Sequence, residues 1–443
     1  MNLPSDSNGP ISGLRNSPSA QVVSRTSITL LILVTALTVR LAAAYWWQAR
    51  LGAEKRFAFG DSESYWRLGQ SIARGESYEY GTGMRVFRTP GYPIALASLF
   101  TALQNDDPPV LYARFLGAVF GTLTVALIMW LARELFDPAT AAIAGTLAAV
   151  YPGAISLSIF VLSEALFCPL MVLQLAAWIM ADRTHGRTSL CLSSAAGVAG
   201  GLAALARPSW LLFAPLAMAT SVFNRDSRLH RLRIGAVVLL TMAATLAPWW
   251  IRNYTITGRF VVTTLQVGAS LYDGLNPAAS GASDMGFVTR FVEEQTEADR
   301  QPSARCEGTF EQRLDRRLRE AAVAWARQNP GQALRLAGVK FLRMWSPWPN
   351  AAEMQSVLFR LLILLGYTPL LLLGLWGLAV RWRQGWPFRM LALPAAYFTA
   401  LHVVFVSSIR YREPAMLVWI VLAGSVLASG TRAVTTPGHN RDA

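Results

Sequence analysis

Two acidic residues and several arginines lie at the edges of long apolar segments, where a charged side chain is costly unless it has a function. Asp61 follows the first apolar segment and opens a helical stretch, and Arg88 stands shortly before the sequence Pro-Gly-Tyr-Pro. A carboxylate can accept the proton of a hydroxyl group, and a guanidinium can bind two phosphate oxygens at once. At one membrane surface the two groups suit a reaction between a hydroxyl acceptor and a lipid-linked phosphate.

A second acid, Glu164, lies in the segment SIFVLSEALFCPL with apolar residues on both sides. An ionisable residue at that depth predicts a functional site. The alternative is a structural ion pair with an arginine of a neighbouring helix. Asp61 also has an alternative role, because aspartate often caps the first turn of a helix.

Four arginines are expected on the same side of the membrane as these acids. Arg88 and Arg207 each stand at the edge of an apolar segment, and Arg410 and Arg412 share a short turn. A lone arginine near a helix end commonly extends to the membrane interface. Several on one face favour a phosphate-binding cluster instead, because guanidinium groups bind phosphate oxygens bidentately.

The composition is typical of a polytopic membrane protein. Of 443 residues, 53% are hydrophobic and only 15% are charged, against roughly 25% charged residues in soluble domains. The net charge of +14 does not require a nucleic-acid partner, because much of the excess lies in short loops that suit the cytoplasmic face. The spacing of the cysteines fits neither a disulfide framework nor a metal site. The sequence also has no P-loop, nucleophile elbow or dinucleotide fingerprint.

The apolar segments predict an all-α bundle of about ten membrane spans with further helices at the interface. The expected spans are Ile28–Trp47, Val110–Phe136, Ala139–Tyr151, Ala165–Ala181, Leu190–Ala206, Ser209–Phe223, Ile234–Ile251, Ser356–Val380, Met390–Val406 and Ala415–Ser429. Asp137 and Pro138 predict the start of the third span, as an N-cap and a first-turn proline. Ile94–Leu103 is too short to span and is expected to be juxtamembrane or re-entrant.

Loop charge predicts the orientation of the chain. The loops Asn224–Arg233, Asp182–Arg187 and Arg381–Arg389 are short and basic, hence cytoplasmic. Trp47–Pro109 and Arg252–Gln355 are then external, together with the residues singled out above. The expected organisation is a disordered cytoplasmic tail over residues 1–27, a transmembrane module over 28–251 with its first external loop over 48–109, an external loop and interfacial-helix region over 252–355, C-terminal transmembrane helices over 356–430, and a cytoplasmic tail over 431–443.

The external region is expected to contain two helices. Apolar residues recur at helical spacing over Phe310–Gln328, and Ala333–Trp345 starts a second helix after Asn-Pro-Gly. The first helix is basic and amphipathic, which predicts that it lies on the bilayer surface. Gln266–Ser283 is rich in Gly, Ala and Ser and is expected to be a loop.

Six motifs extend over nearly the whole chain. They are GDSESYWRLGQSIARGESY with RTPGYP, then FVLSEALF, GLAALARPSWLLFAPL, PWWIRNYTITGRFV followed by LYDGLNP, NPGQALRLAGVKFLRMWSPWP, and RYREP. In this order they resemble the GT-C glycosyltransferases, in particular the bacterial relatives of the dolichyl-phosphate-mannose protein mannosyltransferases and lipid A aminoarabinose transferase. The resemblance implies a GT-C bundle with a module of seven spans and its catalytic acid in the first external loop.

The resemblance also implies roles for three residues. Asp61 corresponds to the catalytic acid, Glu164 to a second active-site acid, and Arg88 to a phosphate contact where relatives often carry lysine. The sequence departs from many relatives at Asp61-Ser62-Glu63, because those relatives have two adjacent acids. A shift of one residue moves a side chain to another helix face, so Glu63 is not expected to take the second acid's role.

Residues and resemblance together predict a multi-pass glycosyltransferase of the inner (plasma) membrane, which moves a sugar from a polyprenyl-phosphate donor to a hydroxyl acceptor on the external face. Asp61 would act as the base, and the arginines would stabilise the departing phosphate. Asp61 and Glu164 could together hold a divalent metal. Expected partners are the polyprenyl-phosphate sugar, membrane lipids and an acceptor that is a protein, a lipid or a glycan, with no nucleic acid.

Two alternatives stay open from the sequence. An enzyme of the same fold could move a preassembled oligosaccharide in place of one sugar. A non-catalytic lipid or solute transporter would use its membrane acids and arginines as coupling sites. A transporter should show repeated halves, whereas the large loops of this chain are placed asymmetrically.

Overall fold

The structure is a computed structural model that describes residues 18–51, 55–81, 83–222, 228–301, 307–349 and 356–435. Apart from one isolated bridge, the regular elements in these ranges are helices, which confirms the predicted all-α fold. The long apolar helices are α1 (Pro18–Leu51), α4 (Val110–Leu135), α7 (Glu164–Arg183), α8 (Gly186–Ala206), α10 (Arg228–Thr257), α15 (Val357–Arg381) and α17 (Glu413–Thr435). The other α-helices are α2 (Gly60–Ala73), α3 (Gly91–Ala102), α5 (Pro138–Val150), α6 (Pro152–Ile159), α9 (Phe213–Val222), α11 (Val267–Gly274), α12 (Val288–Arg300), α13 (Phe310–Gln328), α14 (Pro330–Trp345) and α16 (Trp386–His402).

Seven of the described helices are long and apolar enough to cross a membrane, so the chain is a multi-pass membrane protein. The pair α5 and α6, bent by 57°, makes an eighth candidate if it counts as one span. This count is lower than predicted, because α9 has 10 residues and α16 has 17. The α9 segment is shortened by the 3-10 helix η1 (Pro208–Trp210), so the α-helix begins later than the predicted Ser209.

The predicted start of α5 is confirmed. The side chain of Asp137 accepts hydrogen bonds from the backbone N–H groups of Ala139 and Thr140, each at 2.9 Å, and so caps α5. α3 is a short apolar helix, as expected for Ile94–Leu103. α1 begins at Pro18, earlier than expected, so the last part of the predicted tail over 1–27 is helical. Residues 1–17 and 436–443 of the predicted tails lie outside the described residues.

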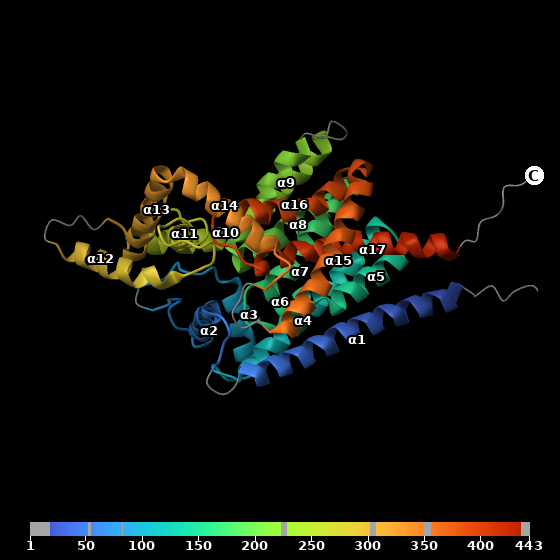
Figure 1. The fold of residues 1–443 in the computed structure, drawn as a ribbon, viewed down its shortest axis with the longest axis horizontal. Coiled ribbons are helices and arrows are strands. Elements are labelled where there is room, and N and C mark those ends of the chain that lie inside the picture. The colour runs from blue at the N-terminus through green and yellow to red at the C-terminus, as the bar shows by residue number, and fades with distance from the viewer. Residues whose placement is uncertain are drawn as a thin grey trace, which may run out of the picture.

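We call residues 252–355 the external region, after the prediction made for them. This region and the described chain ends lie at opposite ends of the molecule (Figure 1). α11, α12 and α13 are grouped at one end, beside α2, whereas the first turn of α1 and the last turn of α17 lie at the other end. The prediction that both tails are cytoplasmic and that the region over 252–355 is external stays a prediction.

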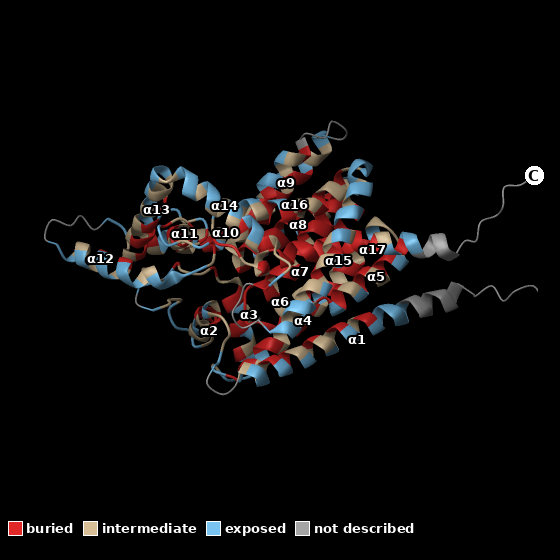
Figure 2. Ribbon diagram, viewed as in Figure 1, coloured by how far each residue is buried: buried red, intermediate tan, exposed pale blue. Residues whose placement is uncertain are grey.

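Burial is concentrated in the middle of the bundle (Figure 2). In the most apolar window of α7, 78% of the residues are buried within the protein, against 17% in α15. Small residues allow this close packing. A Cβ atom added at Gly197 of α8 would lie 2.4 Å from the carbonyl oxygen of Val238 of α10. α7 therefore lies at the centre of the bundle with α8 packed closely against α10, while α15 presents most of its surface outward.

The external region departs from the prediction in two respects. The segment Gln266–Ser283 is not all loop, since it contains α11. α13 has the predicted limits Phe310–Gln328, but its apolar stripe is not free to lie on the bilayer. Leu314 and Leu318 are buried in a cluster with residues of α11 and α12. These helices therefore form a small hydrophobic core of their own beside α2.

Candidate active site

Asp61 lies in the first turn of α2 and forms ion pairs instead of capping the helix. The residue that flanks the helix start is Phe59, which makes no side-chain cap. The carboxylate of Asp61 accepts a hydrogen bond from Nη2 of Arg88 at 2.6 Å and another from Nη2 of Arg410 at 3.3 Å. The capping alternative for Asp61 therefore does not describe this structure.

Arg88 approaches α2 from the irregular segment between α2 and α3. Its Nε donates to Oγ of Ser64 at 3.2 Å, and its guanidinium lies over the ring of Tyr65, with Cζ 5.0 Å from the ring centroid. Ser64 and Tyr65 follow Asp61 by three and four positions, so all three side chains lie on one face of α2. This face holds the guanidinium of Arg88 beside the carboxylate.

Glu164 begins α7 and is buried, with 1% of its side chain exposed. Its carboxylate forms an ion pair with Nη1 of Arg207 at 2.5 Å and another with Nε of Arg410 at 2.9 Å. Arg207 stands between α8 and η1, and Arg410 lies in the 3-10 helix η5 (Ile409–Tyr411). The alternative proposed for Glu164, a pair with arginines of neighbouring segments, thus describes its contacts.

The ion pairs join into one chain of alternating charge, which we call the charge network. It runs from Arg88 through Asp61, Arg410 and Glu164 to Arg207. Three guanidinium groups face two carboxylates, so the network carries an excess positive charge when all its members are ionised. Such an excess, in a site partly withdrawn from water, attracts an anion.

The arginines keep Asp61 ionised. Burial by itself would raise the pKa of Asp61, but the charges and hydrogen bonds of Arg88 and Arg410 outweigh burial and hold the pKa below its ordinary value. Burial opposes the charge of Arg410 too, yet Glu164 and Asp61 raise the pKa of Arg410 above its ordinary value. All partners of Asp61 are therefore charged at neutral pH.

Two cavities meet at the charge network. One has a volume of about 620 Å³ and extends from α2 to α11 and α13 of the external region. The other has a volume of about 410 Å³ and extends past Arg207 along η1 and the end of α16. Asp61, Arg88 and Arg410 line both cavities. Ligands bound in the two cavities would therefore meet at Asp61, whose side chain is 37% exposed.

The structure does not bring Arg412 to the charge network. The Arg412 side chain is fully buried, and its guanidinium lies over the ring of Tyr367, with Cζ 3.4 Å from the ring centroid. It pairs with Glu413 at 3.2 Å and donates to the carbonyl oxygen of Met344 at 3.1 Å. Of the four arginines predicted to bind phosphate, three therefore lie together and Arg412 makes internal contacts.

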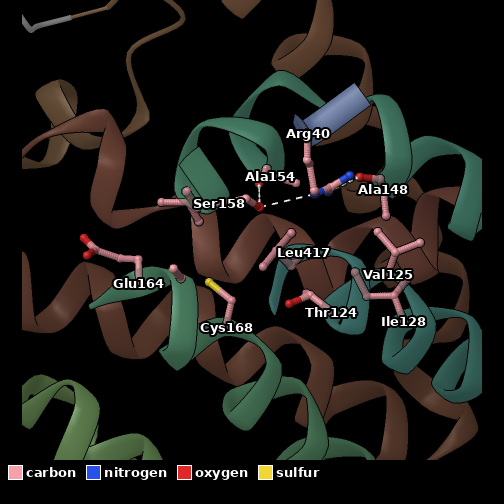
Figure 3. A pocket seen from close by; sticks show the side chains of 13 residues that line it. Arg40, Thr124, Val125, Ile128, Ala148, Ala154, Ser158, Glu164, Cys168 and Leu417 are labelled. Carbon is pink, nitrogen blue, oxygen red and sulfur yellow. Dashed lines mark hydrogen bonds between the residues drawn. The ribbon is translucent and has the colours of Figure 1, made fainter. Parts of the chain in front are cut away.

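Two further arginines hold the bent pair that leads to Glu164. Arg40 of α1 donates to the carbonyl oxygens of Ala148 and Ala149, at 3.0 Å each. Figure 3 shows Arg40 bonded to Ala148 and Ser158, with the carboxylate of Glu164 directed away from them. Arg114 of α4 donates to the carbonyl oxygen at the end of α6 at 2.7 Å. Carbonyl groups at helix ends lack helical partners and carry partial negative charge, so both arginines stabilise the break.

The acids do not fit the divalent metal that the sequence suggested. Among the described residues, no group of three or more His, Cys, Asp or Glu side chains could hold a metal ion. The guanidinium of Arg410 stands between Asp61 and Glu164 and pairs with both. The carboxylates are thus engaged by arginines, whereas Mg²⁺ and Ca²⁺ need several oxygen ligands around one point. No step proposed below uses a metal.

Two residues around the charge network, Ser64 and Tyr411, were not predicted from the sequence. Ser64 bonds Arg88, and the ring of Tyr411 lies beneath the guanidinium groups of Arg207 and Arg410, at 5.3 and 5.1 Å from their Cζ atoms. Ser64 could have been found, because position i+3 from Asp61 shares its helix face. The role of Tyr411 depends on contacts between segments far apart in the chain, for which the sequence carries no local signal.

Comparison with known proteins agrees with the resemblance seen in the motifs. Residues 89–251 match the protein family described as "Dolichyl-phosphate-mannose-protein mannosyltransferase". This match covers less than half of the chain and confirms the resemblance that the motifs indicate. It includes Glu164 and Arg207, whereas Asp61, Arg88 and Arg410 lie outside the matched residues. No curated protein sequence matches the chain.

Solved structures share the fold. The oligosaccharyltransferase of Archaeoglobus fulgidus in its apo form has a TM-score of 0.58 at 16% identity, over 93% of this chain and 51% of that chain. The archaeal oligosaccharyltransferase AglB from the same organism, in complex with an inhibitory peptide and a dolichol-phosphate, also has a TM-score of 0.58 at 16% identity, over 96% of this chain and 53% of that chain. ArnT from Cupriavidus metallidurans bound to undecaprenyl phosphate has a TM-score of 0.46 at 15% identity, over 94% of this chain and 79% of that chain. The chain thus has a GT-C-like fold and spans about half the length of the archaeal proteins.

Proposed function

We propose that the chain is a glycosyltransferase of the plasma membrane, which moves a sugar from a polyprenyl-phosphate donor to a hydroxyl acceptor at the external face. One observation carries this proposal: a reachable carboxylate pairs with two arginines where two cavities meet. The family of residues 89–251 supports sugar transfer. The dolichol-phosphate in the archaeal structure supports a polyprenyl-phosphate ligand for this fold.

The donor fits the smaller cavity. That cavity is lined by apolar residues of the turn after η1 and of the segment after α16, among them Leu211, Leu212 and Phe405, and by Arg88, Arg207 and Arg410. Apolar walls suit a prenyl chain, and the arginines suit its phosphate, because guanidinium groups donate two parallel hydrogen bonds to phosphate oxygens. The acceptor would then occupy the larger cavity between α2 and the external region.

The transfer breaks the bond between the sugar's anomeric carbon and the phosphate oxygen, and forms a bond from that carbon to the acceptor oxygen. The phosphate departs as an anion that the arginines stabilise, so it needs no added proton. The acceptor hydroxyl loses a proton, and Asp61 takes it as general base, a role typically worth roughly a hundred- to ten-thousandfold in rate. Glu164 holds Arg207 and Arg410 in place for the phosphate.

Binding of the donor would also adjust the basicity of Asp61. In the structure, Arg88 and Arg410 lower the pKa of Asp61 against the opposing effect of burial, which makes the carboxylate a weak base. A phosphate that binds the same guanidinium groups adds negative charge beside Asp61. It also accepts hydrogen bonds that these guanidinium groups would otherwise donate to Asp61. Both changes raise the pKa of Asp61 toward the range in which it accepts a proton well.

Mass spectrometry of the cell-envelope glycans tests this proposal. A strain that lacks the chain should lose one sugar from a protein, a lipid or a glycan, and wild-type chain should restore it, while Arg88→Ala should not. Loss of a larger unit would favour transfer of a preassembled oligosaccharide, which the archaeal oligosaccharyltransferase fold also accommodates. Unchanged glycans, together with altered export of a lipid or solute, would contradict the proposed enzyme function and indicate a transporter.

A further inference from the structure

Glu311 of α13 reaches across to the segment that carries Arg88. Its side chain is buried, with 3% of the residue exposed. Its carboxylate accepts hydrogen bonds from the backbone N–H groups of Arg85 and Val86, each at 3.0 Å. These contacts join residues separated by more than half of the chain, and the local sequence of neither segment predicts them.

The backbone carbonyl groups of Arg85 and Val86 also accept hydrogen bonds from residues of the external region. The carbonyl oxygen of Arg85 accepts from Nη1 of Arg252 at 3.1 Å, and that of Val86 accepts from the N–H of Leu265 at 2.9 Å. All four polar backbone groups of Arg85 and Val86 are therefore bonded to residues 252–311. Backbone that is fixed on both sides leaves little freedom to the residues that follow, of which Arg88 is the second after Val86.

We propose that Glu311 is a positioning residue, which fixes the backbone before Arg88 so that the guanidinium meets the phosphate of a polyprenyl-phosphate donor. The choice of ligand rests on the function proposed above, whereas the hold on the backbone does not. The external region would thereby contribute to donor binding indirectly, through its hydrogen bonds to the segment before Arg88.

The contacts of Glu311 argue against other roles. Both oxygens of its carboxylate point at backbone N–H groups, so they are not available to a substrate proton. Glu311 nevertheless stands at the wall of the larger cavity, close to where the two ligands would meet. A carboxylate that accepts two N–H groups cannot be replaced by an amide without loss, because the NH₂ group of glutamine would face one of the two donors.

Hydrogen exchange tests the hold on the backbone without any ligand. In Glu311→Gln and Glu311→Ala, the amides of residues 85–88 should exchange with solvent faster than in the wild type, while those of α2 remain protected. Asp315→Asn is the matched control, because Asp315 is a buried carboxylate on the same helix whose side chain accepts from the N–H of Gly268 at 2.6 Å. Unchanged exchange at residues 85–88 in both Glu311 variants would overturn the proposal.

Binding of undecaprenyl phosphate by the purified, folded variants tests the consequence. Glu311→Gln should weaken binding about tenfold, the loss expected for a charge-assisted hydrogen bond, and the double variant with Arg88→Ala should bind no worse than Arg88→Ala alone. Additive losses, unchanged affinity, or an equal loss in Asp315→Asn would each contradict positioning through Arg88. A wild type that does not bind undecaprenyl phosphate would refute the proposed donor, and hydrogen exchange would still decide whether Glu311 holds the segment.

Discussion

Asp61 and Glu164 carry the same charge but lie in different surroundings. The side chain of Asp61 is 37% exposed and faces both cavities, whereas that of Glu164 is 1% exposed and is enclosed by Arg207 and Arg410. A reaction on an acceptor hydroxyl needs a group that the acceptor can reach. Asp61 is therefore the better candidate for proton transfer, and Glu164 for arranging the arginines.

Arg88 should contribute to donor binding through both charge and geometry. Arg88→Ala removes the guanidinium and should weaken undecaprenyl phosphate binding roughly 10- to 100-fold, as expected for a partly buried charged contact. Arg88→Lys keeps the charge but not the two-pronged geometry, so it should retain an intermediate affinity. Arg67→Ala serves as control, because Arg67 is exposed and pairs with Glu63 on the same helix. Normal affinity in Arg88→Ala would reduce the residue to an interfacial anchor.

Glu311 should make the stability of the protein depend on pH. Burial raises its pKa to about 7, against the opposing effects of the two N–H groups and Arg252, and Asp315 adds to the rise. A pKa that is higher in the folded state than in the unfolded state stabilises the fold at low pH, and this contribution is lost as pH rises toward 7. The thermal midpoint should fall over that range in the wild type and fall less in Glu311→Gln. Identical profiles would show that Glu311 does not titrate there.

At the scale of elements, the break between α5 and α6 sets the position of Glu164. Gly117 and Gly121 of α4 let α6 approach closely, since a Cβ atom at either position would lie 2.0 Å from an oxygen of Ser158. Arg40 and Arg114 then bond the carbonyl groups at the ends of the two short helices. The turn after α6 leads directly to Glu164, so these arginines support the charge network without touching it.

Arg40 should therefore matter for stability. Arg40→Met keeps a long apolar side chain but leaves the carbonyl groups of Ala148 and Ala149 without their partner. An unpaired buried polar group costs about 1–3 kcal/mol, so the thermal midpoint should drop clearly. Arg50→Met on the same helix removes an exposed arginine and should change stability by roughly 0.5 kcal/mol or less. Equal effects of the two substitutions would show that the break does not depend on Arg40.

Elements with strong local signals were predicted correctly, and those that depend on distant contacts were not. The apolar repeat of Phe310–Gln328 gave both limits of α13. The small residues of α11 predict a loop, yet Gly268 serves close packing, since a Cβ atom there would lie 2.0 Å from the carbonyl oxygen of Asp315. Arg410 and Arg412 look alike in sequence, but η5 directs them to different sites. Only the fold separates such neighbours.

At the scale of the whole molecule, the proposed function requires the external region and the short basic loops to lie on opposite sides of the membrane. Leu229 and Ser280 are exposed and stand in these two regions. In a variant without native cysteines, Leu229→Cys should react with an impermeant thiol reagent only from the cytoplasm, and Ser280→Cys only from outside. Labelling of both from one side would refute the topology and the external active site.

The complete molecule joins the matched segment over 89–251 to parts of the chain outside it. Asp61 and Arg88 precede that segment and Arg410 follows it, yet the three line the same two cavities. In the proposed function, the bundle provides the donor cavity and the external region lines the acceptor cavity. The proposed sugar transfer therefore depends on whether the carboxylate at their meeting point accepts a proton.

The rate of transfer by Asp61→Asn tests this claim most directly. Asparagine keeps the shape of aspartate and can still accept a hydrogen bond from an arginine, but it cannot take up the acceptor's proton. The assay measures release of undecaprenyl phosphate from a panel of undecaprenyl-phosphate sugars, with cell-envelope material as acceptor, and Glu63→Gln on the same helix as control. We predict a loss of about a hundredfold or more in Asp61→Asn, with donor binding and thermal stability retained and with Glu63→Gln near the wild-type rate. A wild-type rate in Asp61→Asn would contradict the account.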